Sequence, residues 1–143
     1  MFRIYDGFTL VLRYLRLDMF IFSLLLACAE KTPDSFEGFT SGETYFVRVE
    51  TTPSPIPFNE YFSTQVQVFE DASQESPLED ITVSVNATMP AHEHGMNENP
   101  EMSGPENGVF LAEGLKWHME GEWELAVYVE TENITFTVDC CSE

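Results

Sequence analysis

Basic residues are scarce in this sequence. Lysine and arginine together number 6 against 25 aspartates and glutamates, and the formal net charge of the 143 residues is −19. A surface of this charge repels phosphate backbones, which excludes nucleic acid as a partner. The acidity does not indicate disorder, because 43% of the residues are hydrophobic and 13% are aromatic. We interpret the charge as a means of keeping a folded domain soluble.

Long apolar runs are also absent. The longest stretch without charge near the N-terminus, Met19 to Ala29, has 11 residues, whereas a helix needs roughly 18 or more apolar residues to span a bilayer. We therefore do not expect a transmembrane helix.

Recognisable catalytic motifs are missing as well. The sequence contains no Gly-x-Ser-x-Gly, no His-Glu-x-x-His and no glycine-rich phosphate loop. Carboxylates are so abundant that no particular pair stands out as an acid and base. We expect a protein that is not an enzyme.

The first 27 residues have the order of a signal peptide. Arg3, Arg13 and Arg16 precede the apolar run Met19 to Ala27. The run ends in Leu25-Leu26-Ala27-Cys28, which resembles a bacterial lipobox, where a small residue precedes a cysteine that is acylated and becomes the new N-terminus. The resemblance implies a signal peptide over 1–27 and a lipid on Cys28. An ordinary secretory signal with a structural Cys28 is the alternative.

Export with a lipid on Cys28 implies a protein held at a membrane and facing the periplasm. No aspartate follows Cys28 directly, which favours the outer membrane. Residues 28–41 are polar and predict a flexible tether, which leaves 42–143 as one domain. After cleavage 3 basic and 23 acidic residues remain, for a charge of −20.

Beyond the tether, apolar and polar residues alternate with a period of two almost throughout. Such alternation predicts strands, and Asn107-Gly108 and Thr131-Glu132-Asn133 are turn signals between them. The expected strands cover residues 45–50, 62–68, 81–87, 109–112, 123–129 and 134–140. Short strands at these spacings predict an all-β fold, an immunoglobulin-like antiparallel β-sandwich of about seven strands.

Cys140 and Cys141 form an adjacent pair near the end of the sequence. Neighbouring cysteines rarely bridge each other, because the small ring they close is strained. The pair could bind a soft metal, bridge two chains, or supply one buried and one exposed thiol. The sequence leaves these alternatives open.

Histidine and methionine concentrate in the segment 89–96, which reads Met-Pro-Ala-His-Glu-His-Gly-Met. In an extended chain, His92 and His94 would point to the same side and could bind one ion, while Glu93 would face away. Thioethers suit Cu(I), and imidazole suits copper and zinc, so the mixture favours copper. His118-Met119 is a second imidazole and thioether pair that the fold could bring close.

A purely structural role for the same residues is the alternative. Met89 continues the inward alternation of its strand and could be core, and Pro90 and Gly95 are ordinary turn residues. The candidate metal ligands are therefore hypotheses, and they are His92, His94, Met96, Met89, His118 and Met119.

The sequence resembles the YtkA-like family over roughly residues 43–138. The resemblance is carried by residues 87–96, by Gly108-Val109-Phe110, by residues 115–119 and by Gly121, Trp123 and Glu124-Leu125. The family comprises small secreted or lipid-anchored immunoglobulin-like domains, related to FixH-type and CopC-type proteins. It implies a β-sandwich and a context of copper handling or oxidase assembly, with Met89, His92, His94, Met96 and Met119 at the matching positions. The acidic surface and the terminal cysteine pair depart from the family pattern.

We therefore expect a lipid-anchored protein that binds a copper ion through its histidine and methionine loop, for storage, delivery or detoxification. A copper-receiving or oxidase-assembly protein is the expected partner. The alternative is an adaptor domain that docks onto a membrane complex and binds no metal.

Overall fold

The computed structural model describes residues 34–141. The predicted signal peptide over 1–27 and the lipidation site Cys28 lie outside these residues. Within 34–141, no helix has the length and apolar character needed to cross a bilayer.

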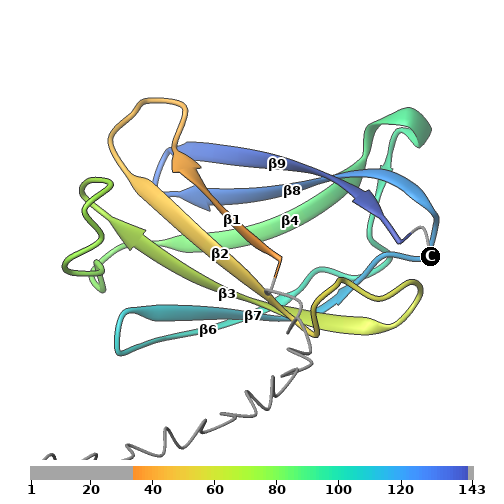
Figure 1. Cartoon of the computed structure of the whole chain (residues 1–143), viewed down its shortest axis with the longest axis horizontal. Coiled ribbons are helices and arrows are strands. Elements are labelled where there is room, and N and C mark those ends of the chain that lie inside the picture. Colours follow the sequence, from red (N-terminus) through yellow and green to blue (C-terminus); the bar gives the residue numbers. More distant parts are fainter. Residues whose placement is uncertain (1–33, 142–143) are drawn as a thin grey trace, which may run out of the picture.

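Residues 34–141 form nine strands arranged in two antiparallel sheets (Figure 1). One sheet has the order β1-β2-β3-β7-β6 and the other β5-β4-β8-β9. The predicted antiparallel β-sandwich is confirmed, with nine strands instead of about seven. The strands are β1 (Ser35–Phe39), β2 (Phe46–Thr52), β3 (Tyr61–Phe69), β4 (Val83–Met89), β5 (His94–Gly95), β6 (Glu101–Glu106), β7 (Val109–Lys116), β8 (Gly121–Val129) and β9 (Glu132–Cys140).

The core lies between the sheets and follows from the period-two pattern. On β8 every second side chain is fully buried, and these are Trp123, Leu125, Val127 and Val129. The facing sheet contributes Val47, Val49, Val66 and Leu115, which are also fully buried. Alternating apolar residues therefore close the space between the two sheets, as the sequence predicts.

Three strands were not predicted from the sequence. Ser35–Phe39 forms β1, which pairs with β2 from Ser35 opposite Glu50 to Phe39 opposite Phe46. The prediction of a tether as far as residue 41 is therefore wrong, because the folded domain already includes β1. Phe36 anchors this strand by packing against Phe136 at a ring-centroid distance of 5.5 Å. The other two, β5 and β6, are short or largely exposed.

One end of the sandwich gathers residues from distant parts of the chain. Here β4 and β9 end and β8 begins, with Gly121 paired opposite Cys140. Cys140 and Cys141 are joined by a disulfide. The Cys141 Sγ lies 3.7 Å from the carbonyl oxygen of Ile56, whose N–H donates to the Asp34 carboxylate at 3.1 Å. The chain therefore enters the domain at the same end at which β9 finishes.

At the opposite end, the turn between β1 and β2 is hydrogen-bonded to the start of β9. The Ser41 N–H donates to the Asn133 carbonyl at 2.8 Å. The Glu132 carboxylate accepts hydrogen bonds from the hydroxyls of Thr40 and Thr44. These bonds lower the pKa of Glu132 from its ordinary value of 4.5, the Thr40 bond having the largest effect.

We predict that Gly121→Ala destabilises the domain more than Gly114→Ala. Both glycines have a positive φ, +118° and +85°, which costs an L-residue about 1–3 kcal/mol. An alanine Cβ at 121 would lie 2.9 Å from Cε of Met89, whereas nothing lies within 4 Å of one at 114. Urea unfolding should show an additional loss of about 1 kcal/mol for Gly121→Ala. Equal losses of stability in the two variants would mean that the Met89 side chain moves aside without an energetic cost.

We also predict that Glu132→Gln destabilises the domain only where Glu132 is ionised. Because folding lowers the pKa of Glu132, its carboxylate stabilises the fold above the unfolded value of 4.5, and this contribution disappears as the pH falls through the folded value. The difference in the free energy of unfolding between wild type and Glu132→Gln should narrow below about pH 4.5. Glu113→Gln, at an exposed position on β7, is the control. A difference independent of pH would contradict the prediction.

Candidate metal centre

The histidine and methionine segment forms a tight hairpin at the end of β4. Pro90–His92 is a single 3₁₀ turn in which the Glu93 N–H donates to the Pro90 carbonyl at 3.2 Å. Glu93 has a φ of 54°, which reverses the chain so that His94 pairs with Met89. The expectation that residues 92–94 are extended is therefore wrong. Pro90 explains this, since its fixed φ suits the first position of a helical turn.

The fold nevertheless brings the three histidines into one row. The ring centroids of His92 and His94 lie 5.7 Å apart, and those of His94 and His118 lie 5.3 Å apart. His118 follows β7, so it reaches His94 from the opposite sheet. His94 is the central ring of the row; it is half-buried, as is His118, whereas His92 is exposed.

A direct contact joins two of the predicted metal ligands, His94 and Met119. The Nε2 of His94 lies 3.3 Å from the Sδ of Met119. On the other side of the ring, Nδ1 lies 3.2 Å from the carbonyl oxygen of Gly95, which can only accept a proton. The tautomer with its hydrogen on Nδ1 pairs with this carbonyl and leaves the Nε2 lone pair facing the sulfur.

In that tautomer a metal ion between Nε2 and Sδ would be bound by both lone pairs. A tetrahedral ion with bonds of about 2.0 Å to nitrogen and about 2.3 Å to sulfur separates its ligand atoms by about 3.5 Å. The observed separation of 3.3 Å is therefore close to that of two ligands on one ion. The bond from Nδ1–H to a backbone carbonyl is also the usual second interaction of a metal-binding histidine.

The three imidazole rings do not converge on a single point. Adjacent rings are nearly parallel, with interplanar angles of 28° and 25°. Imidazole binds a metal in its ring plane, so His92 or His118 has to turn before it can join His94 on one ion. In residues 34–141 no three His, Cys, Asp or Glu side chains form a metal-binding group. A thioether is therefore needed to complete a ligand set.

Trp123 supports this cluster from the core. Its indole N–H donates to the Met119 carbonyl at 2.9 Å, which fixes the backbone of the thioether residue. Its ring lies 6.1 Å from the His94 ring and 5.7 Å from the His118 ring. Behind it Trp117 stacks at 5.5 Å with an interplanar angle of 3°. Sequence reasoning placed Trp123 on a strand and among the family positions, but its part in the cluster depends on contacts between distant strands.

The remaining predicted ligands are Met89 and Met96. Met89 is 2% exposed and belongs to the core, with its Cε directed at Gly121. Met96 is half-buried, and its N–H donates to the Ala87 carbonyl at 3.3 Å. Neither thioether has a contact with a histidine nitrogen like that of Met119.

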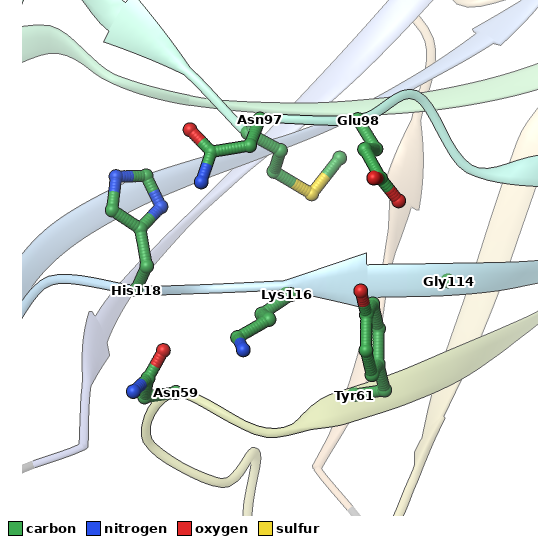
Figure 2. A pocket seen from close by; sticks show the side chains of 8 residues that line it. Asn59, Tyr61, Asn97, Glu98, Gly114, Lys116 and His118 are labelled. Atoms are coloured by element: carbon green, nitrogen blue, oxygen red, sulfur yellow. The ribbon is translucent and has the colours of Figure 1, made fainter.

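A pocket of about 150 Å³ opens beside His118 (Figure 2). Figure 2 shows the His118 ring and the Asn97 amide at one end of it and Tyr61 and Glu98 at the other. Its lining consists of Asn59, Tyr61, Met96, Asn97, Glu98, Gly114, Lys116 and His118. The Nδ1 of His118 is buried and has no hydrogen-bond partner among residues 34–141. The pocket gives His118 a route to solvent, and no sequence signal predicted it.

Comparison with known proteins gives one match. No curated protein and no solved structure matches the chain. The sequence model of the YtkA-like family matches residues 41–128, which is more than half of the 143 residues. The matched part includes the β4–β5 hairpin, His118, Met119 and Trp123. The chain therefore belongs to the YtkA-like family.

Proposed function

We propose that this YtkA-like protein is a membrane-anchored lipoprotein that binds a copper ion between His94 and Met119. The observation that carries the proposal is the position of the His94 Nε2, which lies 3.3 Å from the Met119 Sδ, while Nδ1 lies 3.2 Å from the Gly95 carbonyl oxygen. His118 and His92 are the next available ligands once either ring turns. Met96 and Met89 are further thioethers that could serve as ligands.

The chemistry of the donors selects copper. A thioether is a soft ligand that suits Cu(I), and imidazole accepts copper in both oxidation states. Magnesium and calcium require several oxygen ligands, and the central pair provides none. Zinc sites use thiolate, imidazole or carboxylate and rarely thioether. A mixed imidazole and thioether pair therefore fits Cu(I) best.

The position of the cluster suits an ion that is loaded and released. His92 is exposed, and the pocket beside His118 reaches solvent. Glu93 and Glu124 line a hollow next to His94, and the negative surface raises the local concentration of cations. These features support storage, delivery or detoxification, and none of these functions requires turnover. The proposed partner is a copper-receiving or oxidase-assembly protein in the cell envelope.

We predict that His94→Ala and Met119→Leu each weaken Cu(I) binding at least tenfold, about 1.4 kcal/mol. Each removes one of the two facing ligands, and leucine preserves the volume of methionine. Anaerobic competition with a Cu(I) chelator measures the affinity. Each protein in this experiment also carries Cys28→Ser, so that an unmodified Cys28 thiol cannot bind copper.

Met102→Leu is the matched control for Met119→Leu. Met102 is also half-buried against the core, but it lies on β6, away from the histidine row. Its substitution should leave the affinity within about twofold. Tight binding that survives both His94→Ala and Met119→Leu would place the metal elsewhere. A wild-type protein that binds no copper would favour the adaptor function.

We further predict that Cys28→Ser releases the protein from the membrane fraction. The serine cannot take the acyl chain whose apolar burial holds a lipoprotein at the bilayer. Cell fractionation together with incorporation of labelled palmitate measures this. Cys140→Ser/Cys141→Ser should keep both the label and the membrane location. Palmitate that stays on Cys28→Ser would contradict anchoring at this residue.

A further inference from the structure

The Cys140–Cys141 disulfide joins neighbouring residues at the end of β9. A disulfide stabilises a protein mainly by restricting the unfolded chain, and its effect grows with the length of the loop it closes. With a sequence separation of 1, this bond links no distant segments. The ladder between β8 and β9 already holds Cys140 opposite Gly121. A purely stabilising role therefore does not account for the bond.

The two sulfurs differ in their surroundings. Cys140 is 2% exposed and packs in the core, whereas Cys141 is half-buried at the rim. The Cys141 Sγ lies 3.7 Å from the Ile56 carbonyl, so a reduced thiol at this position has a hydrogen-bond acceptor in reach. The Ile56 carbonyl therefore offers the reduced Cys141 a hydrogen-bond partner, and an attacking thiol meets Cys141 first.

Several sulfur-containing residues lie at this end of the sandwich. Cys140 pairs with Gly121, the Cε of Met89 is directed at Gly121, and Met119 precedes Gly121 by two residues. Methionine and cysteine residues from three segments therefore meet near one glycine. Figure 1 shows β9 ending at the same end of the molecule as the turn that follows β4. Thiols released here would lie at the same end of the domain as the proposed copper pair.

We propose that Cys140 and Cys141 form a reducible second metal site, which binds Cu(I) through both thiolates once the disulfide is opened. A dithiol reductant attacks the Cys141 sulfur and displaces Cys140 as a thiolate, and its second thiol then releases Cys141. The reductant leaves as its own disulfide, and the protein gains two electrons and two protons. Cu(I) displaces both protons and binds as a bis-thiolate, since thiolate is the softest protein ligand for this ion. Reduction thereby increases the number of Cu(I) ions that this end of the domain can bind.

The test uses the full chain with Cys28→Ser, so that the adjacent pair provides the only cysteines. The oxidised and the dithiothreitol-treated proteins are titrated with Cu(I) without oxygen and against a competing chelator. The oxidised protein should bind one equivalent and the reduced protein two, the second with the ultraviolet absorption of a copper thiolate. Thiol counting and circular dichroism establish that reduction takes place in the folded protein. A reduced protein that binds no more Cu(I) than the oxidised one overturns the proposal, as does a disulfide that opens only on unfolding.

Variants separate this site from the His94–Met119 pair. Cys140→Ser/Cys141→Ser should lose only the equivalent that depends on reduction, and Cys141→Ser alone serves if the buried Cys140 is required for folding. His94→Ala/Met119→Leu should lose only the first equivalent. Copper binding by the reduced protein alone would refute the proposed function and support the thiol site. Retention of the reduction-dependent equivalent by Cys141→Ser would refute the thiol site alone.

Discussion

The hydrogen bond from the Trp123 indole to the Met119 carbonyl is the constraint on which the candidate site depends. Trp123 is fully buried and stacks on Trp117, so its donor is fixed by the core itself. The residue that faces His94 is thereby positioned from inside the sandwich, although it lies in a connection between strands. Two imidazole rings rest against the same indole, which couples the arrangement of the site to the packing of the core.

The fold follows from the sequence wherever one face of a strand is buried. On β8, Trp123, Leu125, Val127 and Val129 stand at every second position, and that pattern alone predicted its buried face. The pattern fails for β1, where Gly38 and an exposed Phe39 leave no clear alternation, and for β6, which contains Gly104 and Pro105. These strands form because the neighbouring strands have unpaired backbone N–H and C=O groups at their edges. Pairing through the backbone does not require a pattern of side chains, so the sequence does not reveal it.

Composition identified the residues of the site but not their geometry. The concentration of histidine and methionine in residues 89–96 is a property of the sequence, whereas the pairing of His94 with Met119 joins two segments through the fold. Pro90 and the left-handed Glu93 turned a stretch predicted as extended into a hairpin. The stacking of His94 with His118 depends on how the two sheets pack. Spacing along the chain carries no signal for either contact.

The position of Asp34 limits how far from the bilayer the site would lie. Asp34 accepts a hydrogen bond from Ile56, beside Cys141, so the chain enters the domain at the end that holds the sulfur-bearing residues. Between Cys28 and Asp34 the chain can extend only about 20 Å. A lipid on Cys28 would therefore keep this end of the domain within about 20 Å of the bilayer. A receiving protein would have to present its own ligands at the level of the lipid headgroups, which favours an integral membrane acceptor over a freely diffusing one.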